Sequence, residues 1–288
     1  MSINGHYPQF DPLDWDTIQP FVDTLLTAEL DRESAGGWLQ SWSNLNAAMQ
    51  EAGAHIYRAV TENTADEAAE QRFNRFVEVI LPQMRVAEQA LKQKLLAVAD
   101  GPLADDTIVL MQRFRTEADI FRPENVAIES KLDLLGNQYN KIAGAMTVEW
   151  QGETITIPKA WSLLEEPDRA TRQAVWRRMM DCFLAERGSL NDLYLEMLPL
   201  RRQLAANAGF ASYRDLRWLQ LARFDYTPQD CATFHDAIEA EVVPLASQIY
   251  HELQGRLGIE SMRPWDVDAD PHGQPLRPFS DVAELEAG

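Results

Sequence analysis

The chain has 288 residues, 45% of them hydrophobic and 25% charged, which is typical of a globular protein and excludes a disordered or collagen-like one. Its formal net charge of −19 repels phosphate backbones, and with no local basic patch to reverse it we expect no nucleic-acid partner. Two cysteines are too few for a disulfide framework. The opening MSINGHYPQFDPLDWD lacks the basic and apolar regions of a signal peptide, and no apolar run is long enough for a membrane span. We therefore expect a cytoplasmic protein without a membrane partner.

Helical periodicity dominates the first half of the chain. Apolar residues over 33–61 recur at three- and four-residue steps, as they do on one face of a helix. The TADE sequence that opens residues 64–97 is typical of a capping box and predicts a long helix there, kinked by Pro82. Further helices are expected over about 104–122 and 124–145.

One stretch departs from the helical pattern. Residues 147–157, TVEWQGETITI, alternate between apolar and polar side chains on either side of a Gln-Gly pair. A two-residue turn at 151–152 would place Val148 opposite Ile155 and carry the second strand on to Ile157. The sequence therefore predicts one short β-hairpin lying against helices, because a lone hairpin is marginal in water.

Helices resume after the hairpin. A cap at 166–168 is expected to start a helix that continues through Phe183. The pair at 188–189 would separate it from a second helix, which Gly209 would end, and a short helix is expected over 213–221.

A long helix is then predicted with Thr227 as its N-cap, Pro228 in its first turn and a bend at Pro244. Its apolar residues are Phe234, Ile238, Val242, Val243, Leu245, Ile249, Leu253 and Leu257. Residues 262–279 are expected to form a loop.

The last residues of the sequence predict a further helix. Asp281 and Glu284 have the spacing of another capping box, which predicts a new helix at Asp281. The remaining residues build barely two turns, and so short a helix is marginal by itself. We therefore expect that the sequence is truncated at this point.

His251-Glu252 matches the first two residues of a zinc-peptidase motif. A zinc peptidase needs two histidines four residues apart on one helical face, but the second position here is Gly255. His235 lies about 24 Å away along the same helix, at about 1.5 Å per residue. With Glu239 four residues on it could bind a metal weakly, but a surface hydrogen bond or ion pair is the expected role. We predict no catalytic residue and no complete set of metal ligands in this chain.

The other candidate groups are interpreted as structural. His55 is expected to form a hydrogen bond between helices, and Cys182 and Cys231 are expected to be buried small hydrophobic residues, not nucleophiles. The acidic stretch 268–270 lacks the distal Glu of an EF-hand loop and is expected to be a solvated loop.

Several segments together resemble the oligoendopeptidase F branch of the thimet-oligopeptidase-like zinc metallopeptidases, the M3 family. WLQSWSNLNAAMQEAGAHIYR and TADEAAEQRFNRFVEVILPQ resemble its N-terminal helical domain, and PDRATRQAVWRRM resembles the start of its catalytic domain. The most specific similarities are LRRQLAANAGFASYRDLR and RFDYTPQDCATFHDAIEAEVVPLA. The likeness extends over most of the chain.

The resemblance implies an all-α fold with one hairpin, forming the N-terminal lobe of a two-lobed helical shell around a deep channel that admits short peptides. Residues 1–165 would be the N-terminal helical domain and 166–288 the opening helices of the catalytic domain. In the family, zinc held by HExxH and a downstream Glu activates water, and the Glu of the motif is the general base. Those residues would lie beyond this sequence, in a missing C-terminal lobe, so the chain alone is expected to be inactive.

Arg223, Tyr226 and His235 lie in the most family-like stretch and are candidates for a substrate groove, although capping and packing explain them equally well. An alternative function is a non-catalytic helical scaffold or adaptor that binds peptides or a partner helix. The two hypotheses differ in what the C-terminal part exposes. A half-enzyme should bare a large apolar surface, whereas an adaptor should have a polar one.

Overall fold

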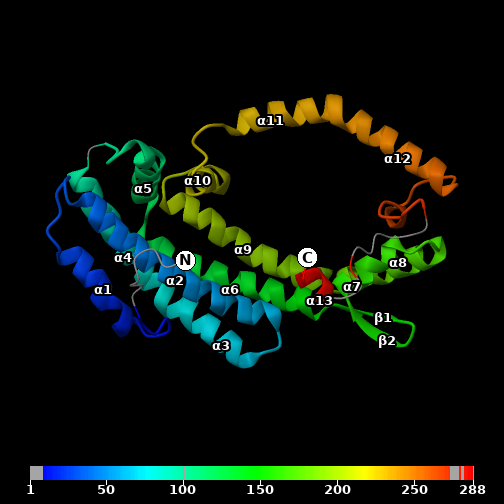
Figure 1. Ribbon diagram of the computed structural model, residues 1–288, viewed down its shortest axis with the longest axis horizontal. Coiled ribbons are helices and arrows are strands. Elements are labelled where there is room, and N and C mark those ends of the chain that lie inside the picture. Colours follow the sequence, from blue (N-terminus) through cyan, green and yellow to red (C-terminus); the bar gives the residue numbers. More distant parts are fainter. Residues whose placement is uncertain (1–8, 100, 273–278, 280–281, 288) are drawn as a thin grey trace. The chain divides into compact units, whose positions relative to one another are not determined.

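The computed structural model describes residues 9–99, 101–272, 279 and 282–287. These residues form helices and one two-stranded antiparallel hairpin, so the predicted all-α class with a single short hairpin is confirmed (Figure 1). The chain divides into two compact units, one made of Met1–Gly144 and Leu190–Asp225, the other of Ala145–Ser189 and Tyr226–Gly288. The expected boundary between an N-terminal and a catalytic domain at residues 165–166 stays a prediction.

The first unit is a packed set of helices. Its elements are α1 (Trp15–Thr27), α2 (Ala35–Glu62), α3 (Glu67–Arg75), the π turn η1 (Phe76–Ile80), α4 (Leu81–Val98), the 3-10 turn η2 (Asp105–Thr107), α5 (Ile108–Ile120), α6 (Pro123–Ala145), most of α9 (Arg187–Asn207) and α10 (Tyr213–Gln220). Trp42, Leu45, Ile80, Leu91 and Leu95, each at most 2% exposed, lie at the centre of its core. The predicted apolar stripe of α2 supplies two of these five residues.

Two local predictions in this unit are wrong. Asp66, not Thr64, is the N-cap of α3, since its carboxylate accepts hydrogen bonds from the backbone N–H groups of Ala68 and Ala69. His55 is exposed, and its Nε2 lies 4.0 Å from Glu51 Oε1 on the same helix, so it is no interhelical partner. The sequence pattern predicts that His55 lies on a helix, but it does not show which face of that helix contacts a neighbouring helix.

The second unit contains β1 (Thr147–Trp150), β2 (Glu153–Thr156), α7 (Ile157–Ser162), the 3-10 turn η3 (Leu163–Glu165), α8 (Arg169–Ala185), α11 (Pro228–Ala237), the π turn η4 (Ile238–Val242), α12 (Val243–Leu257), the 3-10 turn η5 (Pro264–Asp266) and α13 (Val282–Ala287). The hairpin, α7 and α8 enclose a small core of Val148, Ala160, Leu164, Val175 and Met179.

The hairpin has the predicted register. Val148 pairs with Ile155, and both residues of the turn have positive φ, 52° at Gln151 and 88° at Gly152, as a type I′ turn requires. Ile157 was expected to continue the strand, which is wrong because it begins α7. The hydroxyl of Thr156 caps that helix by accepting from the backbone N–H of Lys159.

Helix boundaries in the rest of this unit partly follow the sequence. The cap predicted at 166–168 is Asp168, whose carboxylate accepts hydrogen bonds from the backbone N–H groups of Ala170 and Thr171. The predicted break between two helices is present, but it lies at Glu186 and not at 188–189, since α9 already begins at Arg187. The expected capping box of Asp281 lies outside the described residues, and α13 is described from Val282.

The cysteines are less buried than expected. Cys182 and Cys231 are both half-buried, and the Cys182 thiol donates to the backbone oxygen of Thr147 at 3.0 Å. The prediction that both are buried is therefore wrong. None of the described helices has both the length and the apolar character needed to cross a lipid bilayer.

Candidate functional site

The most unusual surface of the second unit is the run formed by α11, η4 and α12, which we call the arm. It begins as predicted at Thr227, whose hydroxyl accepts from the backbone N–H of Asp230. The Asp230 carboxylate in turn accepts from the backbone N–H of Thr227 at 2.7 Å, which completes a capping box. The helical run then continues without a break to Leu257.

Pro244 does not end the arm. It is the second residue of α12 and has no backbone N–H to donate. The turn before it widens into the π turn η4, in which the N–H of Val243 donates to the carbonyl of Ile238, five residues earlier. The expected bend is thus taken up by a π turn within a continuing helix.

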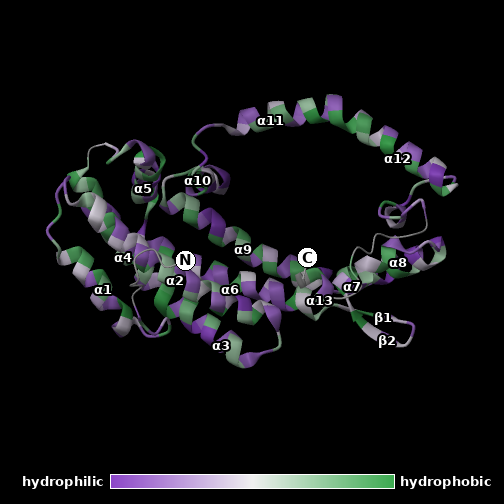
Figure 2. Ribbon diagram, in the orientation of Figure 1, coloured by the Kyte–Doolittle hydropathy of each residue, from purple (hydrophilic) through white to green (hydrophobic). Residues whose placement is uncertain are grey.

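An apolar row runs along the arm and is exposed. No residue of α11, η4 or α12 is buried, and the exposed fraction is 64% for Phe234, 54% for Val242 and 63% for Ile249. Figure 2 shows hydrophobic and hydrophilic residues alternating along these helices. The row contains Phe234, Ile238, Val242, Leu245, Ile249 and Leu253, at the three- and four-residue steps of one helical face. A face of this kind normally packs against a core.

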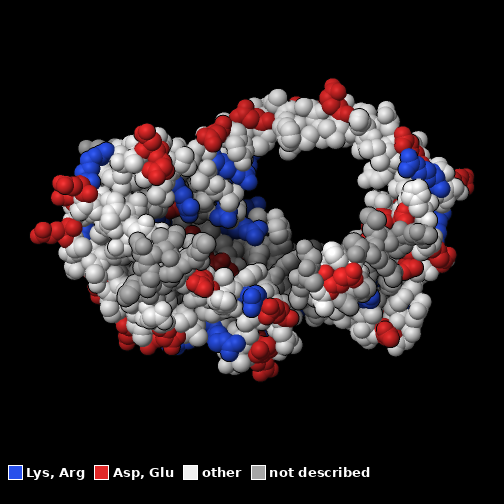
Figure 3. Space-filling view, viewed as in Figure 1, with Lys and Arg blue, Asp and Glu red and all other residues white. Residues whose placement is uncertain are grey.

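Charge is sparse on the visible side of the arm. In the view of Figure 3 most of α11 and α12 is uncharged, with acidic side chains at separate points and basic side chains towards the end of α12. Large apolar side chains that are exposed together mark an interaction surface more often than scattered single ones do. The arm is therefore the candidate functional surface of the second unit.

A buried ionic cluster holds the segment after the arm onto α8. Asp266 is 0% exposed, and one of its oxygens lies 3.0 Å from Arg172 Nη2 while the other lies 2.8 Å from Arg169 Nη2. Arg172, 2% exposed, also donates to the backbone oxygens of Glu166, Pro167 and Trp265. Every charge in the cluster thus has hydrogen-bond partners, as burial demands.

The cluster also shifts the titration of its acid. Burial by itself would raise the pKa of Asp266, but hydrogen bonds from Arg169 and Arg172 and from the backbone N–H of Arg263 outweigh it, so the pKa lies below its ordinary value. Beside it Trp265 packs edge-on against Trp176 at 5.5 Å, with the guanidinium of Arg177 over its ring. The anchor of the arm is therefore ionic and aromatic.

Sequence reasoning missed this cluster. Arg169 and Arg172 lie about one turn apart at the start of α8, and this spacing by itself indicates a basic face exposed to solvent. Their partner Asp266 follows 94 residues after Arg172, in a stretch expected to be a loop. No local signal joins the two segments, because only folding brings them together.

The region around His251 does not fit a zinc ion. The Nδ1 atom of His251 lies 3.0 Å from the backbone oxygen of Ser247, and Glu252 pairs with Arg256 at 3.6 Å. Gly255 offers no ligand where the second histidine would stand. Within residues 9–99, 101–272, 279 and 282–287 no group of three His, Cys, Asp or Glu side chains could hold a metal ion. No chemical step through zinc is therefore assigned to this chain.

The three groove candidates fall in different units. Arg223 belongs to the first unit, where its guanidinium lies over the ring of Trp218 at 4.8 Å. Tyr226, 42% exposed, and His235, also exposed, belong to the second unit, and the imidazole of His235 lies beside the ring of Phe234. Their convergence on one peptide groove stays a prediction.

Comparison with known proteins bears on the part of the chain that carries the arm. Residues 162–288 match the model of peptidase family M3. The family resemblance found in the sequence is thereby confirmed for these residues, which include α8, the arm and the ionic cluster. No curated protein matches the chain.

Solved structures share the fold. PZ peptidase A, determined with an inhibitor, superposes with a TM-score of 0.86 at 19% identity, over 96% of this chain and 50% of its own. A proposed oligoendopeptidase F from Bacillus anthracis str. Ames gives 0.80 at 16% identity, over 91% and 49%. Oligoendopeptidase-F from Enterococcus faecium gives 0.67 at 12% identity, over 89% and 55%. The chain thus spans about half the length of the structures that it matches.

Proposed function

We propose that this chain is one half of a zinc-dependent M3 oligoendopeptidase, which cleaves internal bonds of short peptides in the cytoplasm. In this proposal the apolar face of the arm packs against the half that holds the metal. The observation that carries it is that the region matching the M3 family exposes a regular apolar row along the whole arm. The half-length overlap with the solved peptidases also supports it.

The chemistry divides between the two halves. Zinc, when bound, supplies an activated water for attack on a peptide carbonyl. The described residues of this chain offer no ligand set for it, so their proposed part is to bind the peptide and to complete the shell. Arg223 could bind a peptide carboxylate, and Tyr226 and His235 could form hydrogen bonds with a peptide backbone.

The adaptor hypothesis makes a different demand on the arm. A self-sufficient scaffold should present a polar surface there, yet Leu245 is 52% exposed and Ile249 is 63% exposed. The exposed row favours the half-enzyme, and the adaptor becomes an outcome of the test.

The test compares this chain with a longer one. We expect the codons after Gly288 to encode an HExxH motif within roughly the next hundred positions, the scale of one further domain. The 288-residue chain should bind no stoichiometric zinc and should not cleave a fluorogenic peptide, whereas the longer chain should do both and lose turnover to a chelator.

The arm is tested within the longer chain. Ile249→Asp should lower its thermal stability and its turnover together, whereas Val109→Asp, at a similarly exposed position of α5, should change neither. Chelator-sensitive turnover by the 288-residue chain would overturn the division into halves. A stop codon after Gly288 together with a monodisperse, cooperatively unfolding monomer would establish the adaptor instead.

A further inference from the structure

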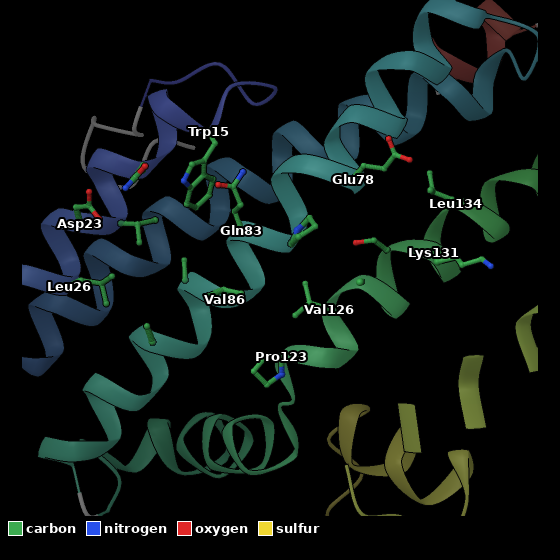
Figure 4. A pocket seen from close by; sticks show the side chains of 17 residues that line it. Trp15, Asp23, Leu26, Glu78, Gln83, Val86, Pro123, Val126, Lys131 and Leu134 are labelled. Atoms are coloured by element: carbon green, nitrogen blue, oxygen red, sulfur yellow. The ribbon is translucent and has the colours of Figure 1, made fainter. Parts of the chain in front are cut away.

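A groove of about 940 Å³ crosses the first unit, lined by α1, α4 and α6. In Figure 4 the labelled side chains of α4 lie between those of α1 and those of α6, so α4 forms the floor and the other two helices form the walls. Its apolar lining includes Trp15, Leu26, Val86, Pro123, Val126 and Leu134.

The groove has the length of a short helix. On α1 its lining extends from Trp15 to Leu26, and on α6 from Pro123 to Leu134, eleven residue steps along each wall. At about 1.5 Å per residue each wall is about 16 Å long, or about three helical turns. An occupant of that length presents side chains at i, i+4, i+7 and i+11, the spacing of an amphipathic helix in a groove.

The floor is too open for a small molecule. Val86, in the middle of α4, remains 53% exposed, and Ala127 on the wall is exposed as well. Small-molecule sites bury roughly 70–90% of their ligand. A floor on which Val86 is exposed while Ala87 beside it is buried instead matches the apolar stripe of a helix whose other face stays in water.

The charged residues that line the groove favour a partner of opposite charge. Asp23 and Glu78 are exposed carboxylates in the lining of the groove, on α1 and on η1. The cation that lines it, Lys131, already pairs with Glu196 at 2.9 Å. The rim therefore presents net negative charge around an apolar floor, which complements a partner with basic residues beside its apolar stripe.

We infer that this groove binds an amphipathic helix of about three turns from a partner polypeptide, with its apolar stripe on α4 and Lys or Arg residues facing Asp23 and Glu78. The inference does not depend on peptidase activity. All residues that line the groove over α4 belong to the first unit, and none of them is Arg223, Tyr226 or His235, the candidates for the substrate groove of the proposed peptidase.

The test uses fluorescently labelled synthetic helices and the full chain. The probe is a peptide of about 18 residues with Leu at four successive positions of one face and Lys on both flanks, long enough to be partly helical alone. Two matched peptides carry Glu in place of Lys, or the same residues in scrambled order. Fluorescence anisotropy should show saturable binding of the Lys peptide, at least about tenfold tighter than either matched peptide.

Variants locate the binding. Val86→Arg should weaken binding of the Lys peptide at least about tenfold, while Ile249→Arg, at a similarly exposed position on the arm, should change it less than about twofold. The double change Asp23→Lys and Glu78→Lys should reverse the preference in favour of the Glu peptide. The matched double change Glu239→Lys and Glu241→Lys on η4 should leave the preference as it is.

Three outcomes would overturn the inference. The first is that the scrambled peptide binds as tightly as the Lys peptide. The second is that Val86→Arg leaves the affinity for the Lys peptide unchanged, in a variant that melts at the temperature of the parent. The third is that Ile249→Arg, and not Val86→Arg, weakens binding of the Lys peptide. The last would place the peptide on the arm.

Discussion

Within the described part of the chain, one π turn lies in the first unit and another in the second, so the same local structure can be compared in two environments. In the first unit η1 precedes Pro82, and in the second unit η4 precedes Pro244; in both, proline is the second residue of the next helix. In both, the residue before the proline donates its N–H to a carbonyl five residues back. A proline that follows helix-forming residues is thus accommodated twice in the same way.

The two regions differ in burial. Phe76, Val77 and Ile80 of η1 are 6%, 1% and 0% exposed, whereas no residue of η4 or α12 is buried. Local sequence therefore determines that each helix accommodates its proline by a π turn, whereas contacts with other segments determine whether its apolar face is buried. The apolar side chains of η1 stabilise a core, and those of η4 and α12 remain on the surface.

The largest expected effect lies where the segment after the arm is anchored. Arg172→Met should lower the free energy of unfolding by about 3–5 kcal/mol, because it removes one of the two guanidinium partners of a buried carboxylate and the Arg172 hydrogen bonds to three backbone oxygens. Urea denaturation measures the change. Arg256→Met, which breaks an exposed pair with Glu252 in the same unit, should cost less than about 1 kcal/mol. Equal losses in the two variants would show that the cluster is not what anchors this segment.

The comparison of the two π turns predicts unequal costs for the same kind of substitution. Ile80→Ala should destabilise the chain by about 2–5 kcal/mol, since Ile80 is 0% exposed and leaves a cavity in the core. Ile249→Ala, at a residue that is 63% exposed, should stay within about 0.5 kcal/mol. Thermal melts of both variants test this. A large loss at Ile249 would mean that the arm is covered in solution.

A smaller loss of stability is expected for a substitution whose only cost is backbone strain. Gly152→Val should cost about 1 kcal/mol or more, because Gly152 has a φ of 88° and no atom stands near a new Cβ. Gln151→Gly, at the neighbouring residue with positive φ, should be neutral or slightly stabilising. Unchanged stability of the Val variant would contradict the type I′ turn.

The smallest expected effect is a difference in pH dependence. Burial raises the pKa of Glu88 and of Glu129 in the first unit above the ordinary 4.5, against the opposing charges of Lys92 and Arg85. A carboxyl with a raised folded-state pKa weakens the fold once it ionises, so the first unit should gain stability as pH falls from neutral towards 4.5. Asp266, whose pKa is lowered, keeps its full contribution above 3.8 and loses it as pH falls further.

Hydrogen exchange of peptides from α4 and α8 separates the two responses. Protection of α4 should rise as pH falls from neutral towards 4.5, after correction for intrinsic exchange, and Glu88→Gln should flatten that rise. Protection of α8 should stay level over the same range and fall below pH 3.8. A parallel response of the two helices would show that these carboxyls do not govern the difference.

The sequence by itself determined the elements whose cause is local. The N-caps Asp168 and Thr227, the hairpin register of Val148 with Ile155, and the apolar stripe of the arm follow from side chains within a few residues of one another. Caps, turns and periodicity act at that range, so these features could be predicted before any tertiary contact was known.

The tertiary structure decided which helical faces are buried. It joins Asp266 to Arg172, and it leaves Ile249 exposed although the stripe around it has the pattern of a core helix. The groove over α4 was likewise not predictable, because Leu26 of α1 and Pro123 of α6 lie far apart in the sequence and line one groove only after folding. Burial depends on which distant segments meet, and periodicity carries no information about that partner.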